Sequence, residues 1–141
     1  MDLRTALTFV GSQQRGVLTT MKADGRPQLS NITYHLGDDG IVRISVTDSR
    51  AKTRNLRRDQ RASLHVTTED FWQYVVVEAR AELTPPATAP DDPTVDELVA
   101  YYRAAAGEHP DWDEYRLAMV EERRLIVRLD PERAYGMLRG Q

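Results

Sequence analysis

Apolar residues at the start of the chain recur at helical spacing, and those that follow alternate as in β-strands. A short amphipathic helix ending near Gly11 is predicted by the apolar positions Leu3, Ala6, Leu7 and Val10. From Gly16 onward, β-rich runs are separated by turn signals at Asp24-Gly25 and at residues 37–40. The predicted strands occupy residues 17–21, 28–36 and 41–46 and form a meander of hairpins.

The second half of the chain continues with strands and then changes to helices. Its predicted elements are a basic helical segment at 51–58, strands at 62–68 and 72–83, helices opening at Thr94 and Asp111, and a strand at 125–129. Thr94 and Glu97 have the spacing of a capping box. Residues 84–93 contain four prolines, which remove amide donors and fix the backbone, so this segment is predicted to be a loop. Pro131 is expected to end the last strand.

These elements predict a mainly β fold with flanking helices. About six strands with short turns, together with a helical pair before the last strand, are typical of an antiparallel barrel with helices at its side. An immunoglobulin-like sandwich is the competing fold. The run from Tyr74 to Val77 lacks polar alternation, which predicts burial on both faces and a barrel wall that packs against a second subunit.

Length and composition narrow the class of protein. With 141 residues, 40% of them apolar, the chain is expected to form one domain, residues 1–141. A net charge of -3 argues against nucleic acid or an anionic membrane as partners, because both attract a basic excess. The chain has no cysteine and no apolar run of signal-peptide or membrane-spanning length. We therefore expect a cytoplasmic protein, in which any redox chemistry would need a borrowed cofactor.

A basic segment stands out against this acidic background. Six of the thirteen residues from Ser49 to Arg61 are Lys or Arg. Because the segment follows a strand and opens a helix, Arg50 and Lys52 would lie beside free amides at a helix N-terminus, where a phosphate is favoured. Arg54 shares a helical face with Arg50 and extends the positive surface. A solvated helix face is the plain alternative, and a nucleic-acid groove is disfavoured because no other basic run extends the patch.

Two predicted strands carry side chains that suit a bound ring system. Gln28 and Ser30 face one side of their strand, and the residues that alternate with them face the other. Polar side chains aimed into a barrel interior need a partner such as a ligand, unless they lie at a solvent-facing edge. Trp72 and Tyr74 also share a predicted strand face, where an aromatic pair either walls a planar ring or belongs to the core.

Little else in the sequence indicates catalytic chemistry. The three histidines are scattered, which gives no metal site, and there is no Ser/His/Asp order, paired carboxylate or glycine-rich phosphate loop. The sequence therefore indicates a place to bind a ligand rather than a set of catalytic side chains.

Several motifs together resemble one family. They are Gly16-Val-Leu-Thr-Thr-Met21, Asp24-Gly-Arg-Pro-Gln-Leu-Ser-Asn31, Arg50-Ala-Lys-Thr-Arg-Asn-Leu56, Trp72-Gln-Tyr74 and Asp111-Trp-Asp113. On these motifs, which extend over nearly the whole chain, the sequence resembles the deazaflavin-dependent branch of the pyridoxamine-phosphate-oxidase-like proteins. The resemblance implies a six-stranded split β-barrel of the FMN-binding, Greek-key type, and a homodimer with a cofactor groove at the subunit interface.

The same resemblance assigns coenzyme F420 to this groove, with FMN as the alternative cofactor. Strand 28–31 would contact the deazaflavin ring or its ribityl chain, and strand 45–47 would line the groove beside it. The start of the basic helix would hold the phosphate and reach toward the glutamate tail. An aromatic pair would enter from the other subunit. The expected cofactor-binding residues are Gln28, Leu29, Ser30, Asn31, Ser45, Val46, Thr47, Arg50, Ala51, Lys52, Arg54, Asn55, Trp72 and Tyr74.

The activity that the resemblance implies is transfer of a hydride between reduced F420 and a conjugated organic acceptor, such as a quinone, a tetrapyrrole or a lactone. Two alternatives stay open. One is an FMN-dependent oxidase acting on a pyridoxine-type phosphate, and the other is a non-catalytic F420 carrier, because no acid or base is evident in the groove. The expected partners are a small-molecule acceptor and a second copy of the chain, without nucleic acid or membrane.

Overall fold

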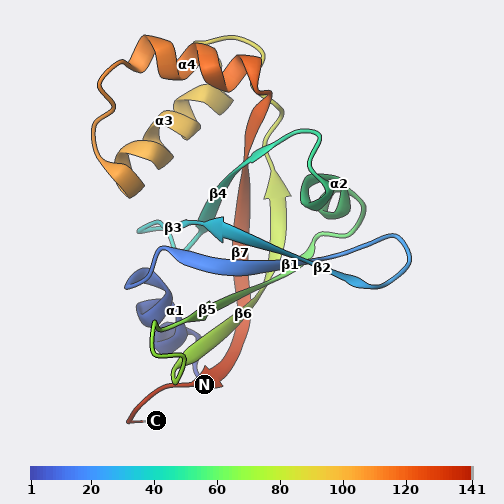
Figure 1. Cartoon of the computed structure of the whole chain (residues 1–141), viewed down its shortest axis with the longest axis vertical. Helices are drawn as coiled ribbons and strands as arrows, with labels where there is room; N and C mark the ends of the chain where they lie inside the picture. Colours follow the sequence, from blue (N-terminus) through green and yellow to red (C-terminus); the bar gives the residue numbers. More distant parts are fainter. Residues whose placement is uncertain (141) are drawn as a thin grey trace.

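The computed structural model describes residues 1–140, in which four helices and seven strands are found (Figure 1). In chain order these elements are α1 (Leu3–Gly11), β1 (Arg15–Met21), β2 (Pro27–Thr33), β3 (His35–Leu36), β4 (Val42–Thr47), α2 (Ala51–Arg58), β5 (Arg61–Thr67), β6 (Tyr74–Leu83), α3 (Pro93–Ala106), α4 (Trp112–Glu121) and β7 (Arg124–Met137). None of these helices combines the length and the apolarity needed to cross a membrane.

All the strands belong to one antiparallel sheet with the order β2-β1-β5-β6-β7-β4-β3. One face of each long strand contributes to a common core, in which Leu18, Ile44, Leu64 and Val77 are buried. The sheet curls around this core, and α1 packs against it beside β6 and β7 (Figure 1). The architecture confirms the mainly β fold of split-barrel type and excludes a sandwich of two sheets.

The sheet has seven strands rather than six because the expected strand 28–36 is interrupted at Tyr34. The Tyr34 side chain points into the core, and its hydroxyl donates a hydrogen bond to the carbonyl oxygen of Val10 at 2.6 Å. Burial raises the pKa of this phenol well above its usual range. At Tyr34 the chain leaves β2, at one edge of the sheet, and continues as β3 at the opposite edge. The two edges therefore meet at this end of the barrel.

β7 continues past Pro131, where the sequence pattern predicts an end, so that prediction is wrong. After Leu129, β7 no longer pairs with β4 and is bonded to β6 alone. The β6–β7 ladder also shifts register between Glu78 and Ala79, opposite Pro131. A strand with a free edge and a bulge tolerates a proline, because fewer ladder hydrogen bonds depend on its amide.

The apolar run on β6 is buried largely by the chain itself. Val75 and Val77 point into the core, whereas Val76 lies on the outer face of the sheet between His65 of β5 and Tyr135 of β7. Burial on both faces, as predicted, therefore has an explanation within one chain. Farther along the outer face, apolar side chains are nevertheless exposed, with fractions of 63% for Leu29, 53% for Tyr135 and 62% for Met137.

α3 and α4 pack as a pair against β7 around a second, smaller core that includes Ile126, and they form the upper part of the molecule in Figure 1. α3 is capped by Asp92, whose carboxylate accepts a hydrogen bond from the Val95 amide at 2.8 Å. The capping box expected at Thr94 and Glu97 is therefore wrong. Glu97 instead bonds to arginines of the sheet, which fastens α3 to the barrel.

Candidate functional site

α2 ties the two edges of the curled sheet together at the end opposite Tyr34. The Asn55 side-chain amide donates hydrogen bonds to Gln28 Oε1 of β2 at 2.8 Å and to Thr20 Oγ1 of β1 at 3.1 Å. In the same helix, Thr53 Oγ1 donates to the carbonyl oxygen of Thr47, the last residue of β4, at 2.8 Å. These contacts fix α2 between β2 and β4.

The strand edges beside α2 carry backbone groups that no other strand pairs with. β2 is bonded to β1 alone, and β4 is bonded to β3 only at Val42 and Arg43, which leaves the edge of residues 44–47 free. A free strand edge presents amide donors and carbonyl acceptors to a ligand. Both edges reach α2: the end of β4 lies near its first turn, through Thr53, and the start of β2 contacts its second half, through Asn55.

The N-terminus of α2 is positively charged and has no side-chain cap. Arg50 is the N-cap residue, and its side chain makes no capping hydrogen bond. Within residues 1–140, no carboxylate lies at ion-pair distance from Arg50, Lys52 or Arg54. Burial, with repulsion from Arg50 and Arg124, lowers the pKa of Lys52. An anion bound here would offset the repulsion and accept bonds from the free amides of the first turn.

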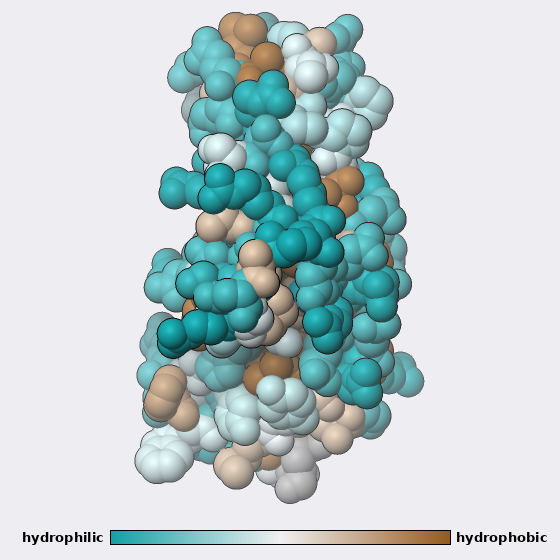
Figure 2. Space-filling view, turned by 90° about the vertical axis from the view of Figure 1, so that its right-hand side faces the viewer, coloured by the Kyte–Doolittle hydropathy of each residue, from teal (hydrophilic) through white to brown (hydrophobic). Residues whose placement is uncertain are grey.

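The remaining cations of the basic segment are already engaged. Arg57 bonds to Asp48 at 2.5 Å, and Arg58 donates to the carbonyl oxygen of Met21 at 2.9 Å. Arg61 begins β5 instead of continuing the helix, and it pairs with Asp59 at 2.7 Å. The free cations therefore gather in the first half of α2, on a side of the molecule that is mostly hydrophilic (Figure 2).

The predicted residues of β2 divide between the two faces of the sheet. Gln28 lies on the core face, in register with Thr20, and Ser30 follows on the same face. Leu29 and Asn31 lie on the outer face, as the alternation predicts. A ligand lying along the free edge of β2 could meet residues of both faces.

The predicted residues of β4 differ in what they offer to a ligand. Val46 is 2% exposed and its side chain belongs to the core, so only its backbone is available. Ser45 and Thr47 point to the opposite face, where Ser45 Oγ accepts a hydrogen bond from Arg124 of β7 at 3.4 Å. Arg124 also pairs with Glu122 at 3.0 Å.

The two predicted aromatic residues lie far from α2 within one chain. Trp72 is in the turn before β6 and is 73% exposed, so the prediction that it shares a strand face with Tyr74 is wrong. Asp70 holds this turn by accepting a hydrogen bond from the Trp72 amide at 3.1 Å. β5 starts beside α2 at Arg61 and is paired with Tyr74 only at Thr67, about 20 Å along the strand.

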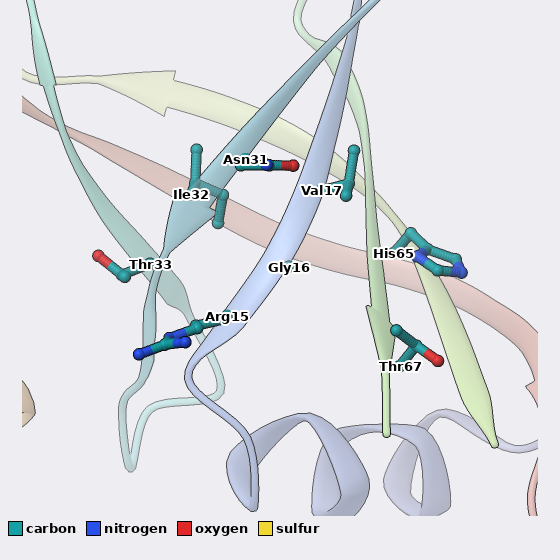
Figure 3. Close-up of a pocket in the computed structure, with 8 residues that line it drawn as sticks. All are labelled: Arg15, Gly16, Val17, Asn31, Ile32, Thr33, His65 and Thr67. Atoms are coloured by element: carbon teal, nitrogen blue, oxygen red, sulfur yellow. The ribbon is translucent and has the colours of Figure 1, made fainter. Parts of the chain in front are cut away.

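A hollow of about 590 Å³ lies on the outer face of β1, β2 and β5 (Figure 3). It is lined by Arg15, Gly16, Val17, Asn31, Ile32, Thr33, His65 and Thr67. Gly16 is required here because a Cβ at this position would meet the carbonyl oxygen of His65 at 2.7 Å. Asn31 is the residue that the hollow shares with the predicted cofactor contacts.

Residues 4–138 match the family model described as pyridoxamine 5'-phosphate oxidase. The chain belongs to this family. Several solved structures are similar in fold. A conserved hypothetical protein from Mycobacterium tuberculosis superposes with a TM-score of 0.73 at 24% identity, covering 96% of this chain and 84% of that one. A structure described as an F420 reductase gives a TM-score of 0.60 at 22% identity, covering 86% and 89% of the two chains.

HutZ, the heme storage protein from Vibrio cholerae, gives a TM-score of 0.68 at 16% identity over 96% of this chain and 94% of its own. At these identities the likeness shows the fold alone. Membership of the pyridoxamine 5'-phosphate oxidase family therefore accounts for the split barrel, and the ligand has to be argued from the residues of this chain.

Some residues of the site were not predicted from the sequence. Arg124 reaches Ser45 and the surroundings of Lys52 from β7, and Thr20 reaches Asn55 from β1. No local pattern marks either residue, because each becomes part of the site only through pairing of strands that are distant in sequence. The resemblance points to the start of α2 and to strands 28–31 and 45–47, but not to Arg124 of β7.

Proposed function

We propose that this chain binds the reduced form of coenzyme F420 and transfers a hydride from it to a conjugated organic acceptor. The main support is the start of α2, where Arg50 and Lys52 stand at an uncapped helix N-terminus without a carboxylate partner. A phosphate at this place would accept bonds from both cations and from the backbone amides of Ala51 and Lys52, which together favour an anion strongly.

The free edges of β2 and β4 suit the polar rim of a planar ring. Gln28 accepts a hydrogen bond from Asn55, which orients its side chain and leaves its own amide hydrogens to donate. Ser30 and Ser45 add hydroxyl groups, and Val46 offers its backbone. The ring would lie along residues 28–31 with its phosphate toward α2.

A glutamate tail would extend along the rest of α2. Arg54 is free to pair with a tail carboxylate, whereas Arg57 is held by Asp48 and acts only through its long-range field. FMN ends at its phosphate and has no group for Arg54. The extra cation is therefore the feature that favours F420 over FMN.

The reaction divides between cofactor and chain. When bound, the reduced deazaflavin supplies a low-potential hydride to a conjugated carbon of the acceptor. The chain binds the cofactor and the acceptor and holds them close together in a fixed orientation, which converts a bimolecular step into an intramolecular one. The proton that completes this two-electron reduction comes from water or from the hydroxyl of Tyr74.

A homodimer is part of the proposal. Trp72 and Tyr74 are too distant from α2 to contact a phosphate held there by their own chain, and the proposal places them beside the cofactor of a second copy. The exposed Leu29, Tyr135 and Met137 on the outer face supply apolar surface for such an interface. Light scattering at micromolar protein should report a dimer, and a concentration-independent monomer would contradict the shared site.

The cofactor is tested by titrating the purified protein with F420 and with FMN. We expect the lower Kd for F420, because Arg54 adds a charge-assisted contact that FMN cannot make. Equal or tighter binding of FMN would overturn the proposal in favour of an FMN-dependent oxidase. Turnover of quinones, tetrapyrroles and lactones with reduced F420 then separates an enzyme from a carrier, since tight binding without any turnover would support the carrier.

A further inference from the structure

The hollow on the outer face is built from two rows of side chains that cross three adjacent strands. The strand register places Asn31, Val17 and His65 in one row across β2, β1 and β5. The next row along the strands is Thr33, Arg15 and Thr67. Figure 3 shows these side chains around the backbone of β1 at Gly16, which forms the floor of the hollow. Its volume of about 590 Å³ is in the range of small-molecule sites.

The polar groups of this hollow are not used by the fold. Within the part of the chain that the structure describes, no ion pair or side-chain hydrogen bond engages Arg15, Asn31 or His65. By contrast, Thr67 Oγ1 donates to the carbonyl oxygen of Gln73 at 3.0 Å. A cation and an amide therefore line one hollow, and their side-chain hydrogen-bonding groups are free.

The chemistry of the lining selects a flat molecule with a negative group. Arg15 presents a planar fork of donors that matches the two oxygens of a carboxylate. Val17 and Ile32 add apolar surface beside the backbone floor, and the His65 ring is held against Tyr74 with ring centroids 5.6 Å apart. A conjugated ring would lie on the floor and against this aromatic pair, with its carboxylate at Arg15.

The hollow also lies beside the expected position of the cofactor ring, which is where a hydride acceptor has to bind. Gln28 contacts α2, and Asn31, which lines the hollow, is three residues farther along β2, or about 10 Å. A ring that extends from the phosphate site along the edge of β2 would therefore end beside the hollow. We infer that this hollow is the acceptor site and that it takes a conjugated carboxylate, whose negative group pairs with Arg15. This inference rests on the proposed function for the role of the ligand as acceptor.

The inference is tested first without a cofactor, by NMR titration of the protein with 2-naphthoate and with the neutral 2-naphthamide. Wild-type protein should bind the carboxylate roughly tenfold more tightly than the amide, and Arg15→Gln should remove this preference. Arg80→Gln is the matched control, because Arg80 lies on the same outer face without a carboxylate partner and belongs to a different part of the sheet. The control should keep the preference.

An Arg15→Gln protein that binds 2-naphthoate as wild type does would overturn the inference. So would a protein in which this change weakens self-association and leaves the carboxylate preference intact, since Arg15 would then pair with a carboxylate of a second copy. Failure of F420 to bind would contradict the proposed function. The 2-naphthoate titration would still report whether Arg15 binds a carboxylate, because it is done without a cofactor. If F420 binds, the ratio of kcat/KM for an acidic acceptor over its amide should fall about tenfold in Arg15→Gln, with the Kd of F420 unchanged.

Discussion

The arginines that join α3 to the barrel and the cations at the start of α2 have similar side chains and opposite surroundings. Arg43 and Arg128 donate to Glu97 of α3 at 3.1 and 2.9 Å, so two cations share one partly buried carboxylate. Arg50 and Lys52 at the start of α2 have each other as neighbours and no carboxylate. The positive charges of the first region are neutralised by a carboxylate of the same chain, and those of the second region are not.

The pKa values of Glu97 and Lys52 are both lowered, but the two shifts have opposite consequences for the charged form of the side chain. Hydrogen bonds from Arg128 and Arg43 lower the pKa of Glu97, so the folded protein stabilises its charged form. Burial and neighbouring cations lower the pKa of Lys52, so the folded protein destabilises its charged form. Charges of the first kind hold the fold together, whereas charges of the second kind are stabilised when a ligand of opposite charge arrives.

The largest effect is expected from breaking the compensated region. Glu97→Ala leaves Arg43 and Arg128 without their shared partner, which should lower the free energy of unfolding by about 2–3 kcal/mol in urea denaturation. Glu82→Ala is the matched control, since Glu82 also pairs with Arg128 but its side chain is 72% exposed. It should cost less than about 1 kcal/mol. Equal losses would mean that burial does not distinguish these carboxylates.

The same region gives a pH dependence. Because the pKa of Glu97 is lowered in the folded state, its contribution is complete above the ordinary pKa of a glutamate, about 4.3, and is lost as the pH falls through the lowered value. The difference in unfolding free energy between wild type and Glu97→Gln should therefore be largest near neutral pH and should disappear at acidic pH. A difference that persists unchanged at pH 2 would show that charge is not its source.

The next largest effect is expected at the uncompensated region. Lys52→Ala should weaken F420 binding roughly tenfold to a hundredfold, because a desolvated charge-assisted contact to phosphate is worth about 1.5–3 kcal/mol. The urea midpoint should stay the same, since no carboxylate loses a partner. Arg61→Ala is the control, because Arg61 is on β5 and pairs with Asp59. If both changes weaken binding equally, the basic segment acts as a diffuse positive surface.

The smallest effect is expected from the tail. Each further glutamate on F420 adds a carboxylate within reach of Arg54, and exposed contacts of this kind are worth about 0.2–1 kcal/mol, so affinity should rise only by a few fold. The gain should shrink as salt screens it. Isothermal titration with coenzymes of different tail length at two salt concentrations measures both quantities. A coenzyme without a tail that binds as tightly as the full one would remove Arg54 from the site.

The fold was predictable from the sequence where its pattern is local. Helical spacing in the first dozen residues, two-residue alternation in the strands and the start of α2 follow from side chains that are near one another in sequence. The break at Tyr34 depends on a hydrogen bond to Val10, and the continuation through Pro131 depends on the loss of β4 as a neighbour. Those facts exist only after the sheet has formed, so no local pattern contains them.

The candidate site divides in the same way. The motif at Arg50 and Lys52 indicated where cations gather, but which cations are free depends on Asp48 and Asp59, which neutralise neighbours in the folded chain. The hollow at Arg15 had no sequence signal, because its lining comes from three strands that are brought together by pairing. Sequence reasoning therefore predicted an anion site at the start of α2, which stays a prediction, and gave no sign of the hollow at Arg15.

The position of α2 at the ends of two free strand edges has a consequence for aggregation. Unpaired edges are templates on which strands of other molecules can add, and natural sheets cover or interrupt them. Asn55 and Thr53 fasten α2 at one end of β2 and β4, so the helix limits how far a foreign strand can pair along either edge. A chain in which these anchors are lost would keep most of its sheet and form intermolecular β-aggregates. The helix proposed to hold the cofactor thus also guards the sheet against polymerisation.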